Sequence, residues 1–357
     1  MSHHFDTKRA KNDPSMNICD MYVFRAHPGS TVMAMTVSAD AGLSAPDALP
    51  VESMYSFRFD TNRDTAEEVV FKFRFGAAEH ADGDEHRHVQ SFRVLRAQAG
   101  AIGGDAGDVL IEGKTGEAAF SPPGVRAFVG MAPELWAADA IAFFNFLTTL
   151  NKEDRFDPNV FLHQKNFFKN RNVMALVLEV PNAMIGVGQV RVWATASLFG
   201  HAPEVQICRW GLPLFTHLYL SDPNQPGLAE KYHQSRPSDD VALFRDAVAT
   251  FITKVASRAG STRDPQAYGQ TVASRLCPVM LPYELDTDAA FGLAEFNGRP
   301  LGIDAYDVML TLAANRPITD GVAPDRNKIL GDFPYYGNPY DSTEQAGLDP
   351  ISTGFYE

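Results

Sequence analysis

Two neighbouring segments of the chain carry large apolar side chains at every second position, and this alternation constrains the fold more than any other feature. The residues concerned are Tyr55, Phe57 and Phe59 in the first segment and Val69, Phe71, Phe73 and Phe75 in the second. A period of two places such side chains on one face of a β-strand. A polar stretch, residues 60–68, joins the two segments. The pattern therefore predicts an antiparallel hairpin with one buried face.

Further strands and a few helices follow from the same kind of pattern. Apolar residues at spacings of three and four predict a helix from about residue 239, which Gly260 ends, and a second helix near 265–276. Another helix is expected over 133–150. The remaining predicted strands cover residues 21–25, 31–37, 89–95, 108–112, 173–180, 190–196 and 205–209. We expect a mainly β protein, with an antiparallel β-sandwich-like body and a helical segment at about 239–277.

Composition and charge exclude several classes of protein. The chain has 357 residues, with 31 Lys and Arg against 44 Asp and Glu, and its net charge of −13 disfavours nucleic acid and anionic membrane surfaces as partners. No uncharged apolar run reaches the length of a membrane span. The first residues carry no apolar stretch typical of a secretory signal, so a cytoplasmic protein is expected. Three widely spaced cysteines predict neither a disulfide framework nor a zinc site.

The N-terminal residues are the first candidate site. After removal of Met1, the chain would begin Ser2-His3-His4, whose amine, amide and imidazole nitrogens suit Cu(II) or Ni(II). Asp13 and Asp20 would add hard oxygen ligands, and Asp20 could also act as a general base. The alternative interpretation is a solvated chain end followed by ordinary turn residues.

A second candidate is the hairpin loop, where Asp60, Asn62 and Asp64 offer oxygen atoms at alternate positions. Calcium loops are built in this way, but they need a glycine at the sixth position and a glutamate at the twelfth. Thr65 and Phe71 stand at those positions. Calcium is therefore only weakly suggested, and a solvated hairpin turn is favoured.

Polar residues inside apolar stretches form a third group. His163, Arg209 and His217 have aromatic or aliphatic neighbours. Such side chains are usually hydrogen-bonded core groups. If one of them faces a cavity, burial perturbs its pKa and makes it a candidate acid–base group. The sequence contains no P-loop, no G-x-S-x-G elbow and no His-Glu-x-x-His, so nucleotide binding is unsupported.

A series of short motifs runs along nearly the whole chain, and the order of these motifs is informative. They are Ser2-His3-His4, Asp13-Pro14, residues 20–24, 60–64, 172–181, 193–195, 209–214 and 297–301, Asp304, Asp307, and residues 320–322 and 333–335. In this order they resemble a largely uncharacterised bacterial family, the domain of unknown function 4331. The resemblance implies one compound unit over 1–357 rather than separate parts at 1–130 and 131–357. Members of that family are usually exported.

The resemblance also implies a site at the N-terminus, because His4 falls where the family has its opening histidine. Our leading hypothesis is a metal-assisted enzyme that acts on a small, largely apolar molecule. A divalent cation would be held by His3, His4, Asp13 and Asp20, and Asp20, His163, Arg209 and His217 would be the catalytic candidates. Hydrolysis, elimination, isomerisation and oxidation all stay open, as does the oligomeric state. The alternative is a non-catalytic β-rich protein that binds a ligand or a partner.

Overall fold

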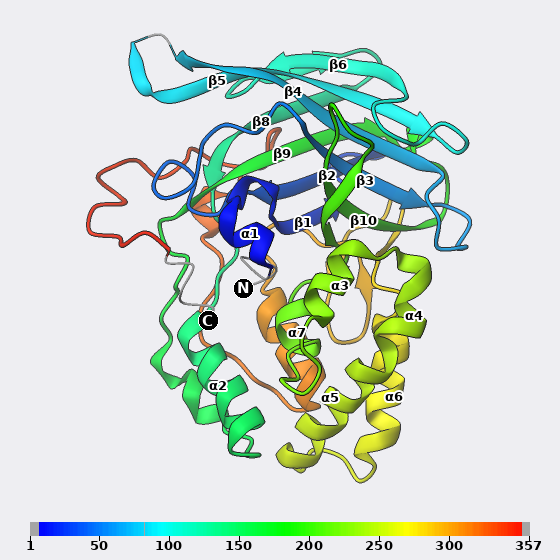
Figure 1. Cartoon of the computed structure of the whole chain (residues 1–357), viewed down its shortest axis with the longest axis vertical. Helices are drawn as coiled ribbons and strands as arrows, with labels where there is room; N and C mark the ends of the chain where they lie inside the picture. Colours follow the sequence, from blue (N-terminus) through cyan, green and yellow to red (C-terminus); the bar gives the residue numbers. More distant parts are fainter. Residues whose placement is uncertain (1–6, 82, 352–357) are drawn as a thin grey trace.

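Two antiparallel β-sheets form the upper part of the molecule (Figure 1). The computed structural model describes residues 7–81 and 83–351 of the chain. The five-stranded sheet has the order β1 (Ile18–Phe24), β2 (Ser30–Val37), β9 (Asn172–Pro181), β8 (Val125–Pro133) and β7 (Ala118–Ser121). The seven-stranded sheet has the order β11 (Val205–Trp210), β10 (Gln189–Leu198), β3 (Ser53–Asp60), β4 (Val69–Ala81), β5 (Asp84–Gln98) and β6 (Asp108–Lys114), and β12 (Leu281–Glu284) pairs with β10.

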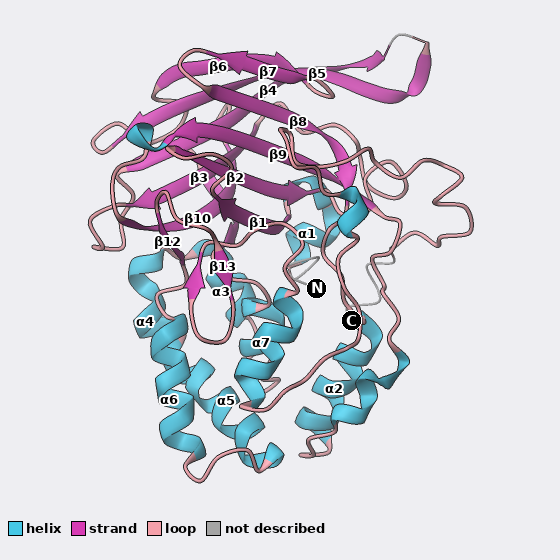
Figure 2. Ribbon diagram, turned by 180° about the vertical axis from the view of Figure 1, so that it is seen from behind, coloured by secondary structure: helices cyan, strands magenta, loops and turns pink. Residues whose placement is uncertain are grey.

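The helices from α2 onward gather below the sheets, as Figures 1 and 2 show from opposite sides. They are α2 (Ala140–Lys152), α3 (Leu228–Gln234), α4 (Asp240–Leu243), α5 (Arg245–Ala259), α6 (Pro265–Leu276) and α7 (Ala305–Ala314), while the short α1 (Lys8–Asn12) precedes β1 and a small ribbon of β13 (Ala290–Phe291) and β14 (Phe296–Asn297) follows β12. The predicted mainly β, antiparallel fold with helices over about 239–277 is confirmed. The described part of the chain contains no helix long and apolar enough to cross a membrane.

The alternating aromatic residues form the predicted hairpin and lie in its buried face. β3 pairs with β4 so that Phe57 lies opposite Phe71. The Phe57 ring meets that of Phe73 edge to face at 6.3 Å, and Phe59 meets Phe71 in the same way at 5.9 Å. All four side chains are fully buried. One contiguous cluster of buried apolar residues includes them and extends through both sheets into α2, α5, α6 and α7.

Local chemistry sets the ends of the helices. α2 begins at Ala140, later than predicted, because Pro133 is still paired with Asn172 at the end of β8. The Asp139 carboxylate then caps α2 by accepting the Ala142 amide at 3.0 Å. Gly260 ends α5 in the left-handed conformation, as predicted.

A late segment of the chain covers the edge strand β1. Val23 and Arg299 exchange two backbone hydrogen bonds, of 3.0 and 2.8 Å. Gly298 allows this approach, since it has a φ of +70° and a Cβ there would lie 2.5 Å from the Val23 carbonyl oxygen. The pairing carries the Arg299 side chain into the protein beside β1.

Candidate functional site

A cavity of about 420 Å³ lies where three distant segments of the chain meet. We call it the Glu134 cavity. Residues 134–137 follow β8, residues 164–170 precede β9, and residues 321–325 follow α7. Gly321 has a φ of +66°, and a Cβ on it would lie 2.5 Å from the Gln164 side chain, so two of the walls approach closely only because this residue is glycine.

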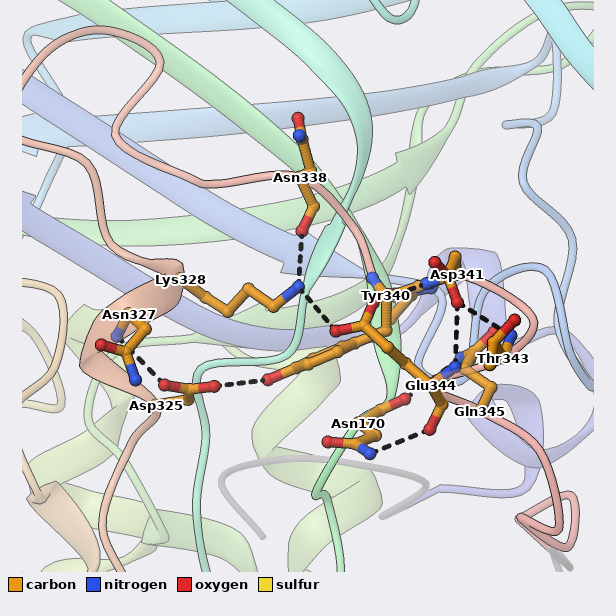
Figure 3. A network of polar contacts seen from close by, with 11 residues as sticks. Asn170, Asp325, Asn327, Lys328, Asn338, Tyr340, Asp341, Thr343, Glu344 and Gln345 are labelled. Atoms are coloured by element: carbon orange, nitrogen blue, oxygen red, sulfur yellow. Dashed lines mark hydrogen bonds and ion pairs between the residues drawn. The ribbon is translucent and has the colours of Figure 1, made fainter.

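A polar network holds the outer wall of the cavity in place (Figure 3). Tyr340 and Asp325 both line the cavity, and the Tyr340 hydroxyl donates to the Asp325 carboxylate at 3.2 Å. The Lys328 ammonium lies 4.1 Å from the centre of the Tyr340 ring and 3.3 Å from Glu344. Asn170, on the opposite wall, donates to the Glu344 carbonyl oxygen at 2.9 Å. The C-terminal segment is therefore fastened to the cavity rim through polar contacts.

Glu134 is a carboxyl group at the cavity whose pKa is raised by burial. Its side chain is only 5% exposed, and its carboxylate accepts the Trp136 amide at 2.8 Å. Burial raises the pKa of Glu134 to about 7, against a smaller opposite effect of the Trp136 amide and of Arg299. The group therefore exchanges its proton near neutral pH, which is the property of a general acid or base.

Behind Glu134 lies a buried ion pair that includes the predicted residue Asp20. Asp20 is fully buried and accepts a hydrogen bond from Arg299, which is 1% exposed. The Arg299 guanidinium carbon lies 4.3 Å from the centre of the Tyr22 ring, 5.4 Å from Trp136 and 5.7 Å from Trp210. The aromatic rings and one carboxylate thus surround the cation and compensate for its loss of water.

Four buried donors around this ion pair have no hydrogen-bond acceptor in the part of the chain that the structure describes. They are the hydroxyls of Tyr22 and Tyr336, the indole nitrogen of Trp136 and Nε of Arg299. Burial raises the pKa of Tyr336. The nearby carboxylates of Glu134 and Asp20 raise it further, whereas Arg299 lowers it. An unsatisfied buried donor costs about 1–3 kcal/mol. Of the four residues, Trp136 lines the Glu134 cavity.

Three carboxyl groups form a second cluster at the beginning of α7. Asp304, Asp307 and Asp320 each offer an oxygen atom within 4.8 Å of the others. Burial raises the pKa of Asp304 to about 7 and that of Asp320 to about 6, and it also raises the pKa of Asp307. No Lys or Arg within residues 7–81 and 83–351 forms an ion pair with any of the three.

The triad is joined to the Glu134 cavity through Asp139 and Trp136. Asp320 directly precedes Gly321 in the cavity wall, and its carboxylate accepts the Asp139 amide at 2.7 Å. The ring of Tyr306, which lies between Asp304 and Asp307 in the sequence, meets Trp136 edge to face at 6.1 Å. A charge on the triad therefore lies behind the wall of the cavity.

The predicted site residues that the structure describes, Asp13, Asp20, His163, Arg209 and His217, do not line one common cavity. His3 and His4 lie outside the described residues. Asp13 accepts a hydrogen bond from the Ser15 hydroxyl before β1. His163 is exposed and His217 is half-buried, and neither lines the Glu134 cavity.

Arg209 binds other structural elements instead of lining the cavity. Its guanidinium donates two hydrogen bonds, of 2.6 and 3.2 Å, to Asp240 on α4, and it lies 4.0 Å from the centre of the Tyr232 ring on α3. Asp240 also accepts the Val279 amide at 2.8 Å. This fully buried pair joins β11 to two helices, which is a structural role.

The oxygens of the hairpin loop are engaged with the backbone of their own turn. Asp60 accepts the amides of Arg63 and Thr65, and Asp64 accepts the Ala66 amide. This is the chemistry of a polar turn. The calcium hypothesis for this loop stays a prediction.

Sequence reasoning missed Glu134 because it is a single acidic residue in an irregular segment, and no spacing rule selects it. The only available signal is a glutamate between apolar residues, in Ala132-Pro133-Glu134-Leu135-Trp136. Asp304, Asp307 and Asp320 belong to the motifs that carry the family resemblance, but the sequence does not indicate them as one group, because Asp320 is distant from the other two.

Comparisons with protein-family models, with curated proteins and with solved structures gave no match for this chain. The resemblance to the domain of unknown function 4331 stays a prediction based on its motifs.

Proposed function

We propose that the protein is an enzyme that transforms a small organic molecule in the Glu134 cavity, with Glu134 as the group that transfers a proton. One observation carries this proposal: a carboxyl group only 5% exposed lines a cavity large enough for a small molecule. A pKa of about 7 gives Glu134 substantial fractions of both protonation states at neutral pH. Strongly perturbed titratable groups in cavities are concentrated at active sites.

The lining of the cavity indicates the class of substrate. Trp136, Phe168 and Val322 provide apolar wall, whereas Asn166 and Asn170 provide amide groups. The amide groups of Asn166 and Asn170 can donate hydrogen bonds to an oxygen atom of a bound molecule. We therefore infer a substrate with an apolar body and at least one carbonyl or hydroxyl oxygen.

The Asp304, Asp307 and Asp320 triad is the best place for the divalent cation of the metal-assisted hypothesis. Carboxylate oxygens are the ligands of hard cations such as Mg²⁺, Ca²⁺ and Mn²⁺. A bound cation would offset the repulsion among the three carboxylates. The cation would act on a substrate in the cavity only through its electric field, across the wall that Trp136 forms, because the three carboxylates do not line the cavity.

Replacement of Glu134 by glutamine tests the proposed role. Wild-type protein is incubated with a panel of small esters, lactones, ketones and alcohols, and conversion is followed by NMR. For any substrate converted, we expect kcat/KM to fall by about 100-fold or more in Glu134→Gln, which is the usual size of a general acid–base effect. The exposed Glu117→Gln is the matched control.

Two results would contradict this role. The first is a Glu134→Gln variant that keeps wild-type kcat/KM. The second is a panel whose members bind in the cavity, with shifts in the Trp136 resonances, but are never converted. The second result would establish the alternative, a non-catalytic ligand-binding protein.

Thermal unfolding in the presence of Mg²⁺, Ca²⁺ or Mn²⁺ tests the cation. We expect a cation at 100 times its Kd to raise the free energy of unfolding by about 2.7 kcal/mol, and the double variant Asp304→Asn/Asp320→Asn to abolish the effect. Asp60→Asn/Asp64→Asn examines the hairpin loop, and His4→Ala examines the N-terminus. A cation effect lost in either of these controls, but kept in the triad variant, would place the cation elsewhere.

A further inference from the structure

A second cavity, of about 440 Å³, lies between α6 and α7, on different residues from the Glu134 cavity. We call it the α6–α7 groove. Tyr268 and Val272 line it from α6, Leu312 lines it from α7, and Leu293 contributes from the loop between β13 and β14. The Tyr268 hydroxyl donates to the Leu312 carbonyl oxygen at 2.6 Å, which joins the two helical walls. Leu293 is 48% exposed. The groove thus has an apolar lining open to solvent.

Two arginines add positive charge to this apolar lining. Arg275 donates hydrogen bonds to the carbonyl oxygens of Leu293 and Gly292, and its guanidinium carbon lies 4.1 Å from the centre of the Phe296 ring. These contacts fix the guanidinium at the groove. Arg316 lies at the end of α7, with its guanidinium carbon 5.5 Å from the Phe156 ring.

Neither guanidinium forms an ion pair with a carboxylate among the described residues, although acidic residues outnumber basic ones in this chain. Arginine recognises carboxylates through its N–H donors. Both terminal nitrogens of Arg275 already donate to a carbonyl oxygen, but each carries a second N–H. Apolar surface that ends at such a cation complements a molecule with an apolar body and an anionic head.

We propose that the α6–α7 groove binds an amphipathic anion, a medium-chain alkyl carboxylate whose chain lies against Val272, Leu293 and Leu312 and whose head group meets Arg275 and Arg316. Charge complementarity selects the anion over a neutral chain of the same length. The overall negative charge of the protein repels anions elsewhere on its surface, so binding at this groove needs its two cations. The site is independent of the Glu134 cavity.

Calorimetric titration of the intact protein with decanoate, below its micelle concentration, tests the proposal. We expect one equivalent to bind, and decanol and decyltrimethylammonium to bind at least tenfold more weakly. Arg275→Gln and Arg316→Gln should each weaken decanoate binding by about tenfold, while Arg263→Gln, an exposed arginine just before α6, should leave it unchanged. Arg316→Gln matters most, because this side chain makes no described hydrogen bond on which folding would depend.

Three results of the titration would overturn the proposal. They are binding of decanol as tight as that of decanoate, binding of several equivalents, and wild-type affinity in both Arg275→Gln and Arg316→Gln. Changes in the NMR chemical shifts of Leu293 and Leu312 locate the ligand. Binding of decanoate without such changes would also refute the proposal. None of these results bears on Glu134, because the two cavities share no residue.

Discussion

Replacement of Arg299 by methionine is expected to destabilise the folded protein by about 3–5 kcal/mol, because it leaves the Asp20 carboxylate buried without its cation. Asp20 is fully buried and Arg299 is 1% exposed, so water does not reach the Asp20 carboxylate to solvate it in place of the lost cation. The variant also loses the contacts of the guanidinium with the rings of Tyr22, Trp136 and Trp210. Chemical denaturation monitored by the fluorescence of Trp136 and Trp210 measures the effect.

Two matched variants separate this buried pair from a surface pair. Arg25 forms an ion pair with Asp288, whose side chain is 89% exposed, and Arg25→Met should cost no more than about 1 kcal/mol. Asp20→Asn/Arg299→Met removes both charges and should recover a large part of the loss. Equal losses in the free energy of unfolding in Arg25→Met and Arg299→Met would show that the buried ion pair stabilises the fold no more than the surface pair does.

Raising the pH from 5 to 8 is expected to lower the stability of the cation-free protein by several kcal/mol. The pKa of Glu134 is raised from 4.5 in a model peptide to about 7 in the folded chain. Between these values the folded chain keeps a proton that the unfolded chain has released. The free energy of unfolding therefore decreases as the pH rises through this window, by up to about 3 kcal/mol for this one group.

The acidic triad also lowers the free energy of unfolding as the pH rises. The pKa of Asp304 is raised from 3.8 to about 7 and that of Asp320 from 3.8 to about 6, so both folded-state protons are also lost on the way to pH 8. Urea denaturation at several pH values measures the slope. We expect Glu134→Gln to flatten it, Asp304→Asn/Asp320→Asn to flatten it further, and Glu117→Gln to leave it unchanged. A slope that is the same in all four proteins would contradict the raised pKa values.

The strands could be predicted from the sequence because their pattern is local. Alternating rings such as Phe57 and Phe59 are selected by one face of a sheet, and the partner strand begins nine residues later, at Val69. The helices over 239–277 follow from spacing in the same way. The start of α2 differs from the prediction, since Pro133 is compatible both with a helix start and with the last position of a strand. The single helix predicted from 239 is divided at Phe244 into α4 and α5. β8 and α7 correspond to no predicted element.

The site could not be predicted in this way because its residues are neither periodic nor close in sequence. Asp20 was selected as a candidate, but its partner Arg299 is 279 residues away. Glu134 owes its character to burial among segments that no local pattern brings together. Arg209 was also a candidate from the sequence, because a charged residue among apolar neighbours is typical both of a functional site and of a structural ion pair. Its fully buried ion pair with Asp240 indicates the structural role.

The pairing of Val23 with Arg299 also has a consequence for biosynthesis. The ribosome makes β1 long before Arg299, yet Arg299 supplies both the backbone that pairs with Val23 and the cation that neutralises Asp20. While the 279 residues from Asp20 to Arg299 are being added, the nascent chain carries a strand without this edge contact and a future buried acid without its cation. Contacts over such long sequence separations are slow to form. The last backbone contacts of β1 and its ion pair can therefore form only after residue 299 has been synthesised.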